Sequence, residues 1–247
     1  MSEHAQILWL VVARSGSKSI PDKNIRPLAG LPLIAYRIKS ARSTKYNAHI
    51  WCSTDSKEYA AIAQKSGATI PFIRPAELAS DTASSADVVC HALEYAAGMG
   101  LTFDYIGLLE PTSPFVYYQY LQEAVEKLDS QADADAIVAV RESTPHPFFV
   151  QDDHIFLDKI SENISHLHFM GRQHFKKQIT PSGGFYIART QAFMKARTFY
   201  TAATMSFLLP FECELEIDQE RDWLWAEFLC EKKIIQQHKI FSNESAI

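Results

Sequence analysis

Near its start the chain reads Ile7-Leu-Trp-Leu-Val-Val12 and continues directly into Ala13-Arg-Ser-Gly-Ser-Lys-Ser-Ile-Pro-Asp-Lys-Asn24. The apolar run has the length and composition of a buried strand. The segment after it places three cations, Arg14, Lys18 and Lys23, among small and flexible residues. Backbone N–H groups of such a loop can approach phosphate oxygens closely, while the cations supply charge. The stretch predicts a phosphate-binding loop at the end of the first strand of an α/β sheet.

The loop differs from two familiar nucleotide motifs. No Gly-Lys-Ser/Thr closes it, so it is not a P-loop, and it lacks the three spaced glycines of the dinucleotide fingerprint. A basic surface turn without a ligand is the alternative interpretation of these residues alone.

Composition limits the class of protein. A chain of 247 residues with 47% hydrophobic and 21% charged residues can form one α/β domain with a large core. The net charge of −5 argues against nucleic-acid binding, which depends on a basic face. We expect a small anionic ligand, no nucleic acid and no membrane partner.

The cysteines and the N-terminal residues indicate a cytoplasmic location. The N-terminal residues lack a basic region, and the first apolar stretch has strand length rather than the length of a signal or membrane span. The cysteines are far apart and include no Cys-x-x-Cys pair, so we expect reduced thiols and neither a zinc site nor a redox motif. They are Cys52, Cys90, Cys213 and Cys230.

Apolar runs and helical stripes alternate along most of the chain. The predicted strands are residues 7–13, 49–53, 69–72, 105–109, 136–140, 184–188 and 204–209. The predicted helices follow Pro32 and the caps Asp55 and Ser56, cover residues 88–96 and 121–128, and close the chain at 221–233. This order predicts an α/β fold with a mostly parallel sheet, helices on both faces and a ligand at the carboxyl ends of the strands.

Residues 141–179 interrupt this alternation. They contain prolines, five histidines and several phenylalanines but no clear crossover helix. We expect an inserted lid or oligomer-forming arm here, with residues 1–140 and 180–247 as the nucleotide-binding catalytic domain. Zinc binding by His166 and His168 is an alternative, but it lacks a third spaced ligand.

Polar residues follow three more of the predicted strands. They are Ser53-Thr-Asp55, Arg74-Pro-Ala-Glu-Leu-Ala-Ser-Asp81 and Glu110-Pro-Thr-Ser-Pro114. Because the carboxyl ends of parallel strands meet at one sheet edge, we expect these segments beside the first loop.

Late in the chain, Glu216-Ile-Asp218 places two carboxylates on the same side of an extended segment. Paired carboxylates suit Mg²⁺, which takes one or two of them together with substrate phosphate and water. The alternative is an acidic helix start that also includes Glu220 and Asp222.

Taken together, the motifs resemble the acylneuraminate cytidylyltransferases, which are the CMP-sialic acid synthetases and their relatives for other nonulosonic acids. The resemblance rests on most of the chain, in order and with similar spacing. Its motifs are the first loop with Gly30-Leu-Pro-Leu-Ile-Ala35, then Ser53-Thr-Asp55, the run 67–81, Pro111-Thr-Ser-Pro114 and Glu216-Ile-Asp218.

The resemblance implies a Mg²⁺-dependent cytidylyltransferase with a Rossmann-like nucleotidyltransferase fold and an inserted dimerisation arm. That family transfers CMP from CTP to the anomeric hydroxyl of a 2-keto sugar acid and releases pyrophosphate. It also implies a homodimer, in which the arm of each subunit covers the sugar pocket of the other.

Roles for individual residues follow from the same resemblance. The catalytic residues are expected to be Arg14, Lys18, Lys23 and Asp218. Nucleotide contacts are expected from Ala13, Arg14, Ser17, Lys18, Lys23, Asn24, Arg74 and Ser85. The sugar is expected at Glu110, Arg172, Tyr186, Phe199 and Tyr200, and the metal at Asp218, with Glu216 as the weaker ligand.

The chain departs from the family pattern at four positions. Many members have glutamine at Glu110, arginine at Val116, arginine at Thr180 and aspartate at Glu216. A carboxylate only accepts hydrogen bonds, so Glu110 should favour a substrate that offers a hydroxyl or amine. Two alternatives therefore stay open: nucleotidyl transfer to another sugar acceptor, or a nucleotide-binding paralogue that has lost turnover and acts as a regulatory subunit.

Overall fold

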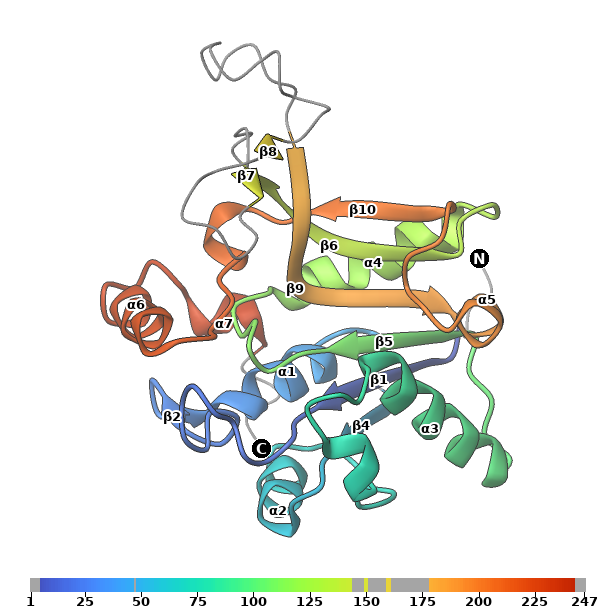
Figure 1. Ribbon diagram of the computed structural model, residues 1–247, viewed down its shortest axis with the longest axis horizontal. Helices are drawn as coiled ribbons and strands as arrows, with labels where there is room; N and C mark the ends of the chain where they lie inside the picture. Colours follow the sequence, from blue (N-terminus) through green and yellow to red (C-terminus); the bar gives the residue numbers. More distant parts are fainter. Residues whose placement is uncertain (1–4, 47, 144–148, 151–158, 161–177, 243–247) are drawn as a thin grey trace. The chain divides into compact units, whose positions relative to one another are not determined.

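The computed structural model describes residues 5–46, 48–143, 149–150, 159–160 and 178–242. Its main feature is a six-stranded sheet with the order β10-β6-β9-β5-β1-β4 (Figure 1). Strand β1 pairs in parallel with β4 and β5, and β10 pairs in parallel with β6, whereas β9 is antiparallel to β5. The strands are β1 (Ile7–Val12), β4 (His49–Ser53), β5 (Tyr105–Leu109), β6 (Ala136–Ser143), β9 (Gln178–Arg189) and β10 (Thr204–Leu208). The predicted α/β fold with a mostly parallel sheet is confirmed.

Helices cover both faces of this sheet (Figure 1). Most of the buried apolar side chains of α1 (Leu33–Arg42), α2 (Lys57–Lys65), α4 (Tyr118–Ser130) and α6 (Glu220–Glu231) belong to one hydrophobic cluster. Those of α3 (Ser85–Gly98) and α5 (Thr190–Ala196) belong mainly to the other. Short elements of the same part of the described chain include the strands β2 (Pro27–Leu28) and β3 (Leu31–Pro32), the 3₁₀ turns η1 (Ala76–Ala79) and η4 (Phe211–Cys213), and the helix α7 (Gln237–Ile240).

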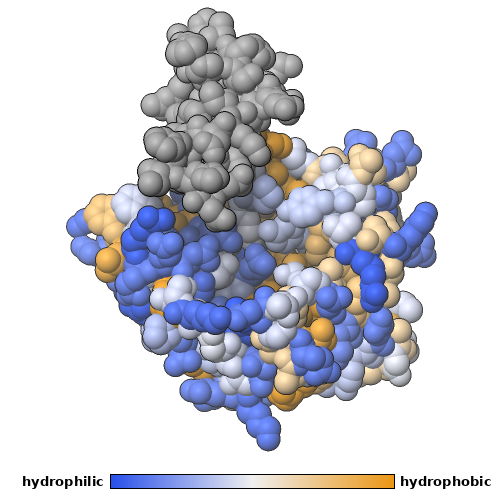
Figure 2. All heavy atoms as spheres, viewed as in Figure 1, coloured by the Kyte–Doolittle hydropathy of each residue, from blue (hydrophilic) through white to orange (hydrophobic). Residues whose placement is uncertain are grey.

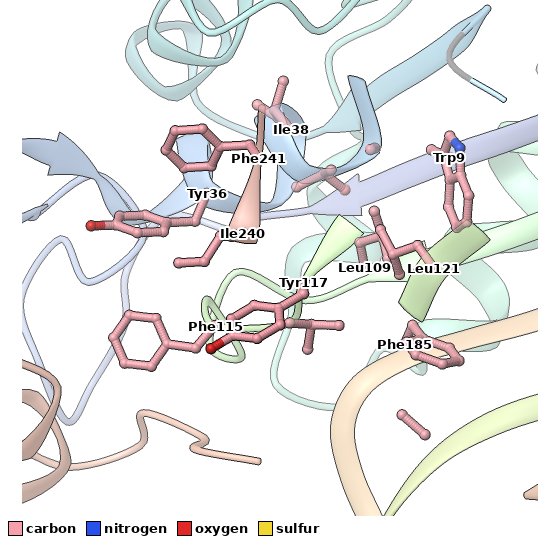
Figure 3. Packing of buried hydrophobic residues seen from close by; sticks show 14 of the residues in the cluster. Trp9, Tyr36, Ile38, Leu109, Phe115, Tyr117, Leu121, Phe185, Ile240 and Phe241 are labelled. Carbon is pink, nitrogen blue, oxygen red and sulfur yellow. The ribbon is translucent and has the colours of Figure 1, made fainter. Parts of the chain in front are cut away.

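Strand β1 contributes to both clusters because its side chains alternate between the two faces. Ile7, Trp9 and Val11 pack into the first cluster, and Leu8 and Leu10 into the second. Figure 3 shows part of the first cluster, which contains Trp9 and Leu109 from the strands together with Tyr36 of α1 and Phe241. A strand buried on both faces fixes the point at which the first loop leaves the sheet.

The helix starts agree with the sequence signals. Ser56 precedes α2, and its side chain accepts a hydrogen bond from the Tyr59 N–H. Ser84 caps α3 in the same way by accepting from the Asp87 N–H. Such caps satisfy N–H groups that have no partner within the helix.

The prediction of a strand at residues 69–72 is wrong. Of these residues, only Thr69 pairs with the sheet, through an isolated parallel bridge to Trp51 in β4. Pro71 has no backbone N–H to donate, which explains why the pairing does not continue. The following residues nevertheless return to the sheet edge, because the Arg74 N–H donates to the Thr54 carbonyl at 2.8 Å.

The contacts divide the chain into two units, residues 1–140 with 181–247, and residues 141–180. Within the second unit, β7 (Phe149–Val150) and β8 (Lys159–Ile160) form an antiparallel pair. The role of this segment as a dimerisation arm stays a prediction, and His166, His168 and Arg172 lie outside the described residues. Among the described residues, no helix has the length and apolar character that spanning a bilayer requires.

Candidate active site

A polar cavity of about 510 Å³ lies where the first loop, the segment 74–85, the turn after β5 and the segment before α6 come together. Two of the three polar strand ends predicted from the sequence, 74–81 and 110–114, therefore line the cavity with the first loop, whereas 53–55 lies outside the lining and contacts that loop through Asp55. Figure 2 shows mainly hydrophilic residues on the side of the molecule where α6 and the first loop lie. The lining includes these predicted residues: Arg14, Ser17, Lys18, Lys23, Asn24, Arg74, Ser85, Glu110, Glu216 and Asp218.

The first loop is held by side chains from neighbouring segments. Asp55 accepts hydrogen bonds from the Ser15 backbone N–H at 2.8 Å and from its hydroxyl at 2.6 Å. Burial alone would raise the pKa of Asp55, but the hydrogen bonds from Ser15 lower it on balance. The Asn24 side chain donates to the Arg14 carbonyl at 3.0 Å and closes the other side of the loop. Ala13 lies outside the lining, and its N–H donates to the Ser53 carbonyl.

Asp81 contacts both of the outer loop cations. Its Oδ1 accepts from Arg14 at 2.6 Å, and its Oδ2 accepts from Lys18 at 2.5 Å. Hydrogen bonds from Lys18 and then from Arg14 lower the pKa of Asp81. The segment 74–84 is thereby linked to the first loop.

Arg74 lies at the inner wall of the cavity and is buried. Its guanidinium donates to the Ser53 hydroxyl at 3.0 Å and to the Ser53 carbonyl. Burial lowers the pKa of Arg74, while Asp55 opposes that shift. Arg74 therefore joins the end of β4 to the cavity wall.

Lys23 connects the first loop to the late acidic segment. Its ammonium donates to the Ile217 carbonyl at 2.8 Å and lies 3.4 Å from Asp218 Oδ1. The Ile217 N–H donates to the Thr112 carbonyl at 2.8 Å, which ties the same segment to the turn after β5. Since Ile217 is buried between them, Glu216 and Asp218 both reach the cavity lining.

The alternative interpretation of an acidic helix start holds for the next two acids. Asp222 accepts from the backbone N–H groups of Asp218 at 3.0 Å and Gln219 at 2.8 Å, and so caps α6. Glu220 forms a two-bond ion pair with Arg26, both bonds being 2.9 Å. The four acids of this stretch therefore divide into two that line the cavity and two that anchor α6.

Glu110 lies in the same wall as Glu216 and Asp218. Burial, then the charges of Glu216 and Asp218, raise the pKa of Glu110 to about 7, although Arg37 and Lys23 act in the opposite direction. Gly183 allows this wall to close up, because a Cβ there would lie 2.9 Å from Glu216 Oε1 and 2.8 Å from Ser113 Oγ. The inner end of the cavity thus concentrates negative charge.

The aromatic residues predicted for the sugar pocket occupy different environments. Phe199 is buried against Phe193, with ring centroids 4.6 Å apart, in the second hydrophobic cluster. Tyr200 is half exposed, and its ring centroid is 6.2 Å from that of Tyr186. Burial and the nearby charge of Glu110 raise the pKa of Tyr186. Within the described part of the chain, none of these three lines the cavity.

The donor set at the inner end fits a hard cation that also binds substrate oxygens. The charges of Glu216 and Asp218 act on Glu110 there, and the cations Arg37 and Lys23 act on it in the opposite direction. Among the described residues, no three His, Cys, Asp or Glu side chains come close enough to hold a metal by themselves. Mg²⁺ usually takes only one or two carboxylates together with phosphate and water, so the arrangement fits that ion.

Sequence reasoning did not predict the contacts that three residues make around the cavity, and the individual role that it gave Asp55 was that of a helix cap. Asp55 and Asp81 stood in the quoted motifs, but their partners are 40 and 67 residues away along the chain. Arg37 in α1 is fully buried, donates to the Gly184 carbonyl at 2.6 Å, and has its pKa lowered by burial to about 9. A charged residue within an apolar helix stripe was the one signal that could have revealed Arg37.

The fold and this cavity together define a nucleotide-binding α/β protein, and comparison with known proteins narrows the class. The profile of the family described as Cytidylyltransferase matches residues 8–244. The chain belongs to this family.

Two relatives and one solved structure indicate the range of similar proteins. The chain is 32% identical over 230 residues to the CMP-N,N'-diacetyllegionaminic acid synthase of Legionella pneumophila, covering 92% of this chain and 97% of the relative. It is 29% identical over 240 residues to the N-acylneuraminate cytidylyltransferase of Escherichia coli, covering 96% of this chain but 55% of that longer protein. A CMP-2-keto-3-deoxy-manno-octonic acid synthetase complexed with CTP has a similar fold, with a TM-score of 0.66, 14% identity and coverage of 93% and 100%.

Proposed function

We propose that this chain transfers CMP from CTP to the anomeric hydroxyl of a nonulosonic acid and releases pyrophosphate. The bond formed joins the acceptor oxygen to the α-phosphorus, and the bond broken joins that phosphorus to the oxygen of the leaving pyrophosphate. The observation that carries the proposal is the position of Lys23, whose ammonium lies 3.4 Å from Asp218 Oδ1. One cavity thus combines phosphate-binding cations with carboxylates able to hold a metal ion.

The proposed roles of the cations follow from their positions in the cavity. Arg14 and Lys18, at the exposed end, would hold the phosphates that leave. Lys23, which is buried, would neutralise charge that develops on the bridging oxygen. Holding CTP and the acceptor in line at fixed points supplies a further part of the rate enhancement.

Mg²⁺ is part of the proposal, with Asp218 and Glu216 as its protein ligands. When bound, the ion would neutralise phosphate charge and orient the triphosphate. The extra methylene of Glu216 gives it a different reach from an aspartate, so Asp218 is the principal ligand of the pair.

The nonulosonic acid as acceptor rests on the names of the relatives and on Glu110. A carboxyl group at this position accepts hydrogen bonds when ionised, which favours an acceptor with a hydroxyl or N–H group beside it. A homodimer and a cytoplasmic location are further parts of the proposal, supported by the family resemblance and by four free thiols.

The direct test is pyrophosphate release from CTP and MgCl₂ with a panel of acceptors. The panel contains an N-acylneuraminate, N,N'-diacetyllegionaminic acid and the eight-carbon 2-keto-3-deoxy-manno-octonic acid. We expect release with at least one nine-carbon acid and its loss when EDTA removes the metal. CTP binding without release for any acceptor would contradict the proposal and favour a nucleotide-binding regulatory subunit.

A further inference from the structure

Asp81 faces the same two cations that are proposed to hold the phosphates of CTP. Each of its carboxylate oxygens has its own partner: Arg14 at 2.6 Å for Oδ1 and Lys18 at 2.5 Å for Oδ2. All three side chains line the nucleotide cavity. The carboxylate therefore lies within the region that the phosphate chain would enter.

A phosphate group and the Asp81 carboxylate are both anionic oxygen acceptors, so they seek the same donors. Arg14 and Lys18 carry further N–H groups that a phosphate could reach. A phosphate oxygen at hydrogen-bond distance from these groups would still lie within about 5 Å of the carboxylate. Like charges at that separation repel each other, so full engagement of both anions at once is unfavourable.

The two ion pairs are exposed, which makes them exchangeable. The side chains of Arg14, Lys18 and Asp81 are 40%, 78% and 49% exposed. Exposed ion pairs between single charges contribute little to stability. A triphosphate carries several charges and three or more acceptor oxygens, so it is the stronger ligand for the same cations.

Asp81 belongs to a segment whose hydrogen bonds are largely local. Ser80, which precedes it, bonds to the Glu77 carbonyl at 3.0 Å and to Thr82 at 3.2 Å. The Ala83 N–H donates back to the Ser80 carbonyl at 3.3 Å. Such a turn keeps its own bonds when the Asp81 carboxylate leaves its partners.

We propose that Asp81 is an affinity-determining residue of the nucleotide site, an internal counter-anion that the phosphates of CTP displace from Arg14 and Lys18. It lowers the affinity for CTP and returns to the cations as pyrophosphate leaves, which speeds product release. This inference rests on the proposed function.

The test compares Asp81→Asn with Glu77→Gln. Both changes remove one negative charge from the same segment, but Glu77 lies outside the cavity lining. Dissociation constants for inorganic pyrophosphate and for CTP are measured by calorimetry with MgCl₂ at low salt. We expect Asp81→Asn to bind both ligands roughly three- to tenfold more tightly than wild type, and Glu77→Gln to bind them as wild type does.

The opposite result would show that Asp81 positions the cations for phosphate rather than competing with it. Unchanged or weaker binding in a folded Asp81→Asn protein, with a melting temperature close to wild type, overturns the proposal. A gain of equal size in Glu77→Gln also overturns it, because the effect would then come from net charge alone.

A second pair of variants tests for direct competition. In a Lys18→Met background, Asp81→Asn should increase the affinity for pyrophosphate less than it does in wild type, because one of the two contested cations is gone. An undiminished gain would contradict the mechanism. If wild type binds neither CTP nor pyrophosphate, the proposed function itself fails, whereas wild-type binding without a gain in Asp81→Asn removes only the role of Asp81.

Discussion

The two ends of the nucleotide cavity use the same residue types in different surroundings. At the exposed cation end, Lys18 is 78% exposed and pairs with Asp81. At the buried acid end, the Lys23 side chain is 10% exposed and donates to the Ile217 carbonyl, although the Asp218 side chain beside it is 64% exposed. Water screens the first group and lets it exchange partners, whereas burial holds the Lys23 ammonium in place. The position of a charge therefore decides whether it binds ligand reversibly or organises the site.

The largest expected effect comes from removing the buried cation. Lys23→Met keeps the aliphatic chain but loses the ammonium, so we expect kcat to fall about 100- to 1,000-fold (~3–4 kcal/mol) with a smaller change in KM. Pyrophosphate release under saturating CTP measures this. If kcat fell no further in Lys23→Met than in Lys18→Met, the buried and the exposed lysine would not differ in their contribution to turnover.

The next effect concerns the wall that the buried acid end shares with β9. Gly183 has φ +68°, and an added Cβ would meet Ser113 and Glu216. We expect Gly183→Ala to reduce the free energy of unfolding by about 1–3 kcal/mol, measured with urea. Gly98→Ala is the control, because nothing lies within 4 Å of a Cβ there and a helical site should gain stability. Equal stability of the two variants would show that the wall adapts without cost.

The next prediction concerns the pKa of Glu110 at the buried acid end and its effect on stability. Its pKa is raised from an ordinary 4.5 to about 7 in the folded protein. Between these values the folded state holds a proton that the unfolded state has lost, so stability falls as pH rises from 4.5 to 7. Glu110→Gln removes this loss. We expect the free energy of unfolding of Glu110→Gln to exceed that of wild type by about 1–3 kcal/mol at pH 8 and to differ little from it at pH 4.5.

Denaturant titrations at both pH values measure the effect of Glu110→Gln, and Glu77→Gln, on an exposed side chain of η1, serves as the control. The same difference from wild type at pH 4.5 and pH 8 would mean that Glu110 titrates normally.

The smallest effect belongs to the exposed cation end. Lys18→Met should raise the KM for CTP roughly three- to tenfold at low ionic strength, and the difference should shrink at 0.5 M salt, ~4 Å Debye length, because exposed charges are screened. Initial rates across a salt series measure this. A KM difference that persists undiminished at high salt would place Lys18 with the buried groups.

Much of the fold could be predicted because its signals are local. The strands at His49–Ser53 and Tyr105–Leu109 have the predicted bounds, and the helices after Pro32 and Ser56 begin where their signals lie. Residues 69–72 have the same apolar character, but Pro71 limits pairing at the sheet edge. The antiparallel direction of β9 has no local signal, since it depends on where the chain re-enters the sheet.

The site was predictable in its residue types rather than in its partnerships. The carboxyl ends of β1, β4 and β5 had to meet, which brought the first loop, Arg74 and Glu110 together. The pairing of Asp81 with the loop cations depends on tertiary structure, and no motif or spacing in the sequence indicates it. For Phe199 the sequence was ambiguous, because an aromatic residue gives the same pattern whether it lines a pocket or packs into a core. Phe199 packs into the second hydrophobic cluster.

One tryptophan of α6 lies where its fluorescence could respond to ligand binding. Trp223 is fully buried, the Arg26 guanidinium lies 4.3 Å from the centroid of its ring, and its indole N–H donates to Glu227 at 3.0 Å. Trp223 directly follows Asp222, which accepts a hydrogen bond from the Asp218 N–H. We therefore expect ligand binding near Asp218 to change the tryptophan emission without a label, and the part of the change that a Trp223→Phe variant loses belongs to Trp223.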